Sequence, residues 1–181
     1  TGKIVLTPNP QIIPADGVSN SVIQSGVIYD QQNNPIAENT QFTVETSMGT
    51  IISTDVNPAL AGIQIGADDS GRVQFTLHSA DTGGIAFISV NSVNGSAFGN
   101  ARVIMSSVTI DQISSPFKTV SQGQVGVPVS MIVKNLSPNT ISDVTAELLF
   151  IGPPPQRENR NSDFINIQRT DGITEIPSLS T

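Results

Sequence analysis

The chain has no cysteine and no tryptophan, and only one tyrosine and one histidine among its 181 residues. The lack of cysteine excludes disulfide bonds, thiolate metal sites and cysteine nucleophiles. Without tryptophan, there is little of the flat aromatic surface on which sugar-binding domains stack their ligands. No apolar run approaches the ~20 residues that a membrane-spanning helix needs. The chain begins at Thr1 rather than at methionine, so we expect a piece of a longer protein.

Charged residues are also scarce. They make up 13% of the chain against 37% hydrophobic residues, so Ser, Thr, Asn, Gln and Gly must cover most of the surface. Divided at Ser106, the first part has 3 basic and 8 acidic residues and the second has 5 and 7, which gives −5 and −2 and sums to the net charge of −7. Neither part is therefore a basic module for binding nucleic acid.

Alternation of apolar and polar residues with a period of two is the main structural signal. In Arg72–His78 it predicts that Val73, Phe75 and Leu77 face inward. Strand-like segments of the same kind are Lys3–Thr7, Ser21–Tyr29, Gln41–Thr46, Ile85–Val90 and Ala101–Met105. Turn-forming runs such as DDSG, DTGG and VNGS separate them. Several short strands at this spacing predict a β-sandwich or barrel.

A second part begins near Ser107. Its strand-like segments are Val108–Ile110, the long alternation QVGVPVSMIVK over residues 124–134, Val144–Phe150 and the run FINI. Pro128 lacks a backbone donor, which places the long strand at a sheet edge or beside a bulge. Four or five strands are fewer than the seven of a complete sandwich. We expect a second domain that is cut short, the alternative being that its missing strands come from elsewhere.

Several motifs occur in order along the first part. They are Ala15–Ser19 (ADGVS), Asp30 at a strand end, the turn residues Asn34–Pro35, an Asp68-x-x-Gly71 turn before an alternating strand, and Thr82–Gly84 before another. Over about residues 3–105 the sequence resembles the bacterial immunoglobulin-like domains of the invasin and intimin type. The second part resembles, more weakly, an adhesion-related bacterial β-sandwich domain, through Gly123–Gln124 and Lys134–Asn135.

The resemblance implies two tandem immunoglobulin-like β-sandwiches, one over 1–106 and one over 107–181. It implies a non-catalytic stalk or adhesion module at the bacterial cell surface or outside the cell. The implied partners are neighbouring domains of a longer chain, and a host receptor or an extracellular polysaccharide. The alternative is a pair of accessory domains, including polysaccharide-binding ones, in a large secreted enzyme.

Candidate chemistry is sparse, and each candidate has a structural explanation. His78 lies near Ser79 and Asp81, but a catalytic triad is defined by geometry, and we predict that His78 is a surface strand residue. Asp68 and Asp69 invite a calcium interpretation, but ADDSG lacks the spaced acidic residues of a calcium loop, so we predict a solvated turn.

A covalent Lys–Asn cross-link is a further hypothesis. Lys3 on the first strand could approach Asn100 on the last, with Glu45 nearby, provided that the lysine is buried enough to lower its pKa. The seven phenylalanines are expected mainly in the core. We predict no catalytic, metal-binding or cofactor-binding residue and no cofactor, and we predict that the chain is not an enzyme.

Overall fold

The structure is a computed structural model that describes residues 2–117, 124–142 and 175–176. Within these ranges the regular elements are all β-strands. Among the same residues, no helix is long and apolar enough to cross a membrane.

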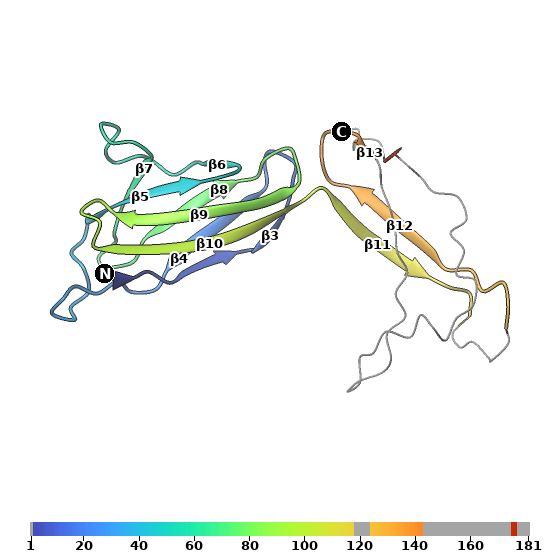
Figure 1. Ribbon diagram of the computed structural model, residues 1–181, viewed down its shortest axis with the longest axis horizontal. Helices are drawn as coiled ribbons and strands as arrows, with labels where there is room; N and C mark the ends of the chain where they lie inside the picture. The colour runs from blue at the N-terminus through green and yellow to red at the C-terminus, as the bar shows by residue number, and fades with distance from the viewer. Residues whose placement is uncertain (1, 118–123, 143–174, 177–181) are drawn as a thin grey trace.

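Two sheets pack face to face in the first part (Figure 1). The four-stranded sheet has the order β2 (Leu6–Asn9), β4 (Asn20–Ser25), β8 (Gln74–His78), β6 (Thr50–Ile51). The six-stranded sheet has the order β1 (Gly2–Lys3), β10 (Ala97–Ser106), β9 (Gly84–Ser92), β5 (Gln41–Thr46), β7 (Ile63–Gly66), and β3 (Ile12–Pro14) also pairs with β10.

The strand order identifies the fold of the first part. The order β2-β4-β8-β6 corresponds to strands A, B, E and D of an immunoglobulin domain, and β10-β9-β5 corresponds to G, F and C. Strands β1 and β3 run parallel to β10, and all other pairs in the two sheets are antiparallel. The predicted immunoglobulin-like sandwich is therefore confirmed for this part of the chain.

The core lies between the two sheets and follows the predicted alternation. Val73, Phe75 and Leu77 are each at most 1% exposed, as the pattern in Arg72–His78 predicts. From the opposite sheet, Phe42 and Val44 of β5 are buried against them. Burial of this apolar area stabilises the fold by roughly 25 cal/mol per Å².

The first two predicted strands end differently from the prediction. Lys3–Thr7 divides into β1 and β2, because Ile4 is buried in the core where the chain changes from one sheet to the other. Strand β4 ends at Ser25 instead of continuing to Tyr29. The turn that follows is formed as predicted, since the Asp30 carboxylate accepts hydrogen bonds from the backbone N–H groups of Gln32 and Asn34.

The long loop before β7 protects a sheet edge. The backbone N–H of Val56 donates to the carbonyl of Gln64 at 2.9 Å, and the Asp55 carboxylate accepts from the Gln64 N–H at 3.1 Å. These bonds occupy the free side of β7, where another chain could otherwise add a strand. The loop of residues 52–62, between β6 and β7, therefore has an architectural role.

In the second part, β11 (Val108–Ser114) pairs with β12 (Ser130–Asn135), with a bulge between Ile110 and Gln112. Strand β13 (Ile141–Ser142) pairs with β14 (Glu175–Ile176). The strand predicted over 124–134 starts only at Ser130, beyond Pro128, which has no N–H to pair. The strands predicted at Val144–Phe150 and in FINI lie outside the described residues, so the second, incomplete sandwich over 107–181 stays a prediction.

Candidate functional site

In the candidate triad, His78 and Ser79 each have a hydrogen-bond partner outside the triad. The His78 ring on β8 faces the neighbouring strand, where its Nδ1 contacts the side-chain oxygen of Asn20. The Ser79 hydroxyl donates to the Asp16 carboxylate at 2.9 Å and accepts from the Gly17 N–H. The Ser79 hydroxyl therefore donates to a carboxylate and not to His78. A catalytic serine must donate to the histidine that acts as its base.

The calcium candidate is a turn in this structure. One carboxylate oxygen of Asp68 accepts from the backbone N–H groups of Ser70 and Arg72, at 2.9 and 2.8 Å. Asp69 accepts from the Ser70 hydroxyl. In the described part of the chain, no three His, Asp or Glu side chains gather closely enough to hold a metal ion.

The cross-link hypothesis does not meet its physical condition. Lys3 is exposed on β1, and Asn100 and Glu45 are exposed on β10 and β5. The cross-link needs a buried lysine, and Lys3 is not buried. The structure therefore does not support an isopeptide bond at Lys3.

Asp16 is the centre of a polar network in the first sandwich. Its carboxylate accepts from the backbone N–H groups of Val18 and Ser19 and from the hydroxyls of Ser19 and Ser79, at 2.7 to 3.0 Å. Partial burial acts to raise the pKa of Asp16, but the four hydrogen bonds outweigh it and lower the pKa from 3.8 to about 2. The carboxylate therefore clamps the chain before β4 to the end of β8.

The hydrogen bonds of the ADGVS segment also hold the two chain segments that lie next to the contact between the two parts. The Gly17 N–H donates to the Ala80 carbonyl at 3.1 Å, and the Ala15 N–H donates to the Ser106 carbonyl at 2.9 Å. The loop after β8 and the end of β10 are thereby tied to the same ADGVS segment. The next residue of that loop, Asp81, contacts the second part of the chain.

A set of hydrogen bonds joins the two parts. Only Ser107 separates β10 from β11 (Figure 1), and its carbonyl accepts from the Leu136 N–H at 2.7 Å. The Asp81 carbonyl accepts from the Ser137 hydroxyl at 2.7 Å and from the Asn139 side-chain amide at 3.3 Å. We refer to Ser107, Asp81 and the turn Asn135–Asn139 as the joint.

The turn Asn135–Asn139 is organised by its own side chains. Asn135 accepts from the Ser137 N–H at 2.7 Å and donates to the Asn139 carbonyl at 2.7 Å. Both Asn135 and Ser137 are only 3% exposed. The donors of the turn are therefore held in place before they meet Asp81, which lowers the entropy that is lost in forming the joint.

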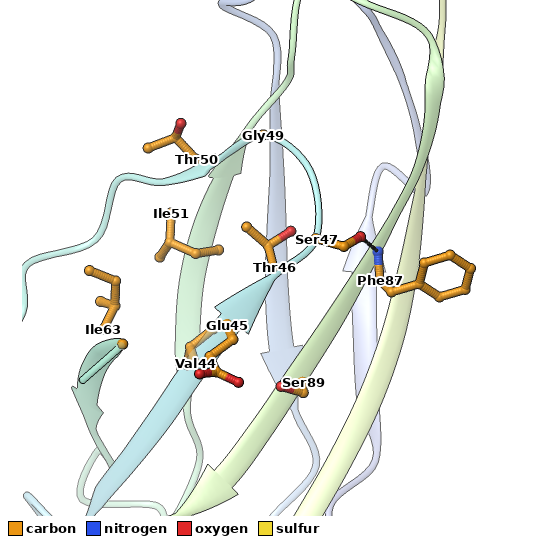
Figure 2. A pocket seen from close by; sticks show the side chains of 11 residues that line it. Val44, Glu45, Thr46, Ser47, Gly49, Thr50, Ile51, Ile63, Phe87 and Ser89 are labelled. Carbon is orange, nitrogen blue, oxygen red and sulfur yellow. Dashed lines mark hydrogen bonds between the residues drawn. The ribbon is translucent and has the colours of Figure 1, made fainter. Parts of the chain in front are cut away.

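The described residues also form surface depressions. A groove of about 760 Å³ lies between β5, β6 and β7, and Figure 2 shows Glu45 near the apolar side chains of Val44, Ile51 and Ile63. Glu45 is its one ionisable lining residue. A hollow of about 380 Å³ lies beside Phe87 and Arg102. In the groove the Glu45 carboxylate accepts no hydrogen bond from a lining serine or threonine, which is the contact by which a base activates a nucleophile.

The joint could not be predicted from the sequence. The ADGVS motif and the Lys134–Asn135 strand end are recognisable there, but neither indicates a contact between the two parts. The partners Asp81 and Asn139 are separated by 58 positions. A local sequence pattern cannot predict such a contact, because periodicity indicates only which face of a strand is buried.

Comparison with known proteins shows similarity at the level of solved structures. No protein-family model matches the sequence, and no curated protein matches it. A C-terminal fragment of intimin, solved with the intimin-binding domain of the translocated intimin receptor, is 18% identical over 72% of this chain and 45% of that one, with a TM-score of 0.47. Invasin, described as a bacterial integrin-binding protein, is 18% identical over 86% and 34%, with a TM-score of 0.44.

A glycosyl hydrolase family 2 member from Bacteroides cellulosilyticus is 16% identical over 58% of this chain and 14% of that one, with a TM-score of 0.45. The chain thus spans less than half the length of each of these structures. The similarity to intimin and invasin that the motifs predict is found, at low identity. At these TM-scores the fold assignment rests on the strand order given above.

Proposed function

We propose that the chain is a non-catalytic structural module of a bacterial cell-surface or secreted protein. It acts as a stalk or spacer that presents loops or neighbouring domains at a distance. The observation that carries this proposal is the joint, which combines a one-residue connection with hydrogen bonds from both sides.

The physical argument concerns orientation. A flexible connection needs several residues that are free to rotate, as in Gly/Ser-rich linkers. Here Ser107 alone separates β10 from β11, and its carbonyl is bonded to Leu136. Strand β10 has 10 residues and spans roughly 33 Å at about 3.3 Å per residue. An orientation fixed at the joint therefore also determines the position of the far end of the sandwich.

The partners in this proposal are the neighbouring domains that such a spacer separates. In the longer protein they include a terminal domain that contacts a host receptor or an extracellular polysaccharide. The spacer determines how far from the cell that contact is made. Nothing in this role requires a bound cofactor or a reactive side chain.

A distance measurement between the two parts tests the proposal. The chain lacks cysteine, so replacing Gln74 and Gln112, both exposed, with cysteine gives two unique spin-label sites. We expect a narrow distance distribution by double electron–electron resonance. A matched control inserts a Gly-Ser linker between Ser107 and Val108, which should broaden the distribution. A native distribution as broad as that of the control would contradict the stalk function.

A further inference from the structure

Phenylalanine is placed differently from the sequence prediction. Of the five phenylalanines in the described residues, only Phe42 and Phe75 are buried. Phe87, Phe98 and Phe117 are 58%, 48% and 45% exposed. The expectation that phenylalanine sits mainly in the core is therefore wrong for these three. Figure 2 shows the Phe87 ring pointing away from the β5–β6 groove.

Phe87 belongs to a continuous apolar surface on the outer face of the six-stranded sheet. Ile12, Ile104 and Ile85 lie in register across β3, β10 and β9. Phe87 follows Ile85 two positions along β9, on the same face. These four side chains are 39% to 60% exposed. With roughly 200 Å² for a large side chain, they present on the order of 400 Å² of apolar surface, within the range of functional patches on monomers.

Charges of opposite sign flank this surface. Arg102 on β10 lies opposite Phe87 in the register, and Lys3 on β1 lies farther to the same side. Glu45 on β5 lies on the other side of β9, opposite Ser89. Within the described residues the one ion pair joins Lys134 to Asp111, so these three charges have no ionic partner there. The face is basic on one side of β9 and acidic on the other.

We propose that this face is the interface of a homodimer, in which a second copy of the chain packs its own outer sheet against it. A two-fold axis parallel to β9 brings the Phe87 rings of the two copies together. Because β10 and β5 lie on either side of β9, the same rotation lays β10 of one copy over β5 of the other, and the interface is isologous. Arg102 then lies about two residues, roughly 7 Å, along the strand from Glu45 of the second copy. The long arginine side chain spans that separation.

The size of the surface sets the strength of the dimer. Interfaces are roughly 60% apolar, so about 400 Å² of apolar surface corresponds to about 700 Å² of total footprint per copy. Stable complexes bury about 800 Å² per partner. The dimer is therefore a reversible one that forms as the concentration rises. The charge pattern selects this orientation of the two copies, because like charges face and repel each other in other orientations.

Analytical ultracentrifugation of the full 181-residue chain over a wide concentration range tests this. We expect a concentration-dependent monomer–dimer equilibrium. Phe87→Ser should raise the dimer Kd by at least about tenfold, because it removes the central aromatic contact. The matched control is Val22→Ser, at a side chain that is 38% exposed on β4 of the other sheet. It should leave the Kd unchanged.

Charge exchange tests the orientation. Glu45→Arg and Arg102→Glu should each weaken the dimer, and the double variant should recover most of the wild-type Kd. All these sites are exposed, so thermal unfolding should confirm that each variant is folded. A chain that is monomeric at every concentration overturns the proposal. So does a dimer that Phe87→Ser leaves intact, or a double variant no stronger than the single ones.

Discussion

At the residue scale, Asp16 shows how one carboxylate links a sequence motif to the fold. Its four hydrogen bonds satisfy two backbone donors and two hydroxyls, one of them from Ser79 at a separation of 63 positions. Hydrogen bonds to a charged group contribute more than neutral ones. In the ADGVS motif the aspartate is therefore the structural centre, and its charge is stabilised when the chain folds.

The lowered pKa of Asp16 predicts a loss of stability in acid. The pKa is 3.8 for the unfolded chain and about 2 in the fold. The unfolded chain then binds the proton more tightly, so the contribution of this carboxylate is complete above about pH 4 and is lost as the pH falls toward 2. Asp16→Asn should lower the free energy of unfolding at neutral pH and flatten its dependence on pH over this window.

Chemical denaturation at a series of pH values provides the measurement. Asp69→Asn is the control, because Asp69 is exposed and bonded only to its neighbour Ser70. This control should keep the wild-type pH dependence. An Asp16→Asn variant whose stability falls between pH 4 and 2 as steeply as that of the wild type would refute the assignment.

At the element scale, the connection between β5 and β6 depends on Gly49. Its φ is +74°, a conformation that favours glycine. A Cβ at this position would lie 2.3 Å from the His78 carbonyl oxygen and 2.8 Å from the Met105 side chain. Strand β6 can therefore reach β8 only because this residue has no side chain.

The left-handed backbone conformation alone costs about 1 kcal/mol when a side chain is present. Gly49→Ala should lower the free energy of unfolding by clearly more than this amount. Gly95→Ala is the matched control, because Gly95 has φ +72° and open space where a Cβ would lie. Urea denaturation of both variants separates the clash from the backbone conformation. If both variants lost the same free energy of unfolding, the close approach of Gly49 to His78 would not contribute to stability.

At the scale of the whole molecule, the joint determines how the sandwich relates to the rest of the chain. The first sandwich contributes the Asp81 carbonyl, and the second part contributes a turn held in shape by Asn135. The Asp16 network fixes the loop that carries Asp81. The Asp16 network of the first sandwich therefore holds in place the loop that supplies the acceptor of the joint.

Ser137→Ala should loosen the joint without unfolding the sandwich. The variant loses the hydroxyl that donates to the Asp81 carbonyl, worth about 0.5–1.5 kcal/mol. We expect a broader distance distribution between spin labels at positions 74 and 112, with the thermal midpoint of the first sandwich unchanged. Ser70→Ala, in an exposed turn, is the control. An unchanged distribution would mean that Ser137 does not hold the joint.

The sequence by itself determined the faces of the inner strands and several turns. In Arg72–His78 the apolar residues occupy one face only, so period two predicted the burial of Val73, Phe75 and Leu77. In the same way, Asp30 could be predicted to close its turn, since its partners are within four positions. These are local properties, and a short window of residues contains all the information that they need.

Tertiary structure alone decided which faces are covered and which distant segments meet. The run Ile85–Val90 is apolar on both faces, and only the packing of the two sheets buries Ala86 and Ile88 while leaving Ile85 and Phe87 exposed. The contact of Asp81 with Ser137 likewise depends on how the chain leaves β10. The physical reason is that a side chain is buried only when a second surface packs against it. The sequence of one strand does not say which of its faces that second surface covers.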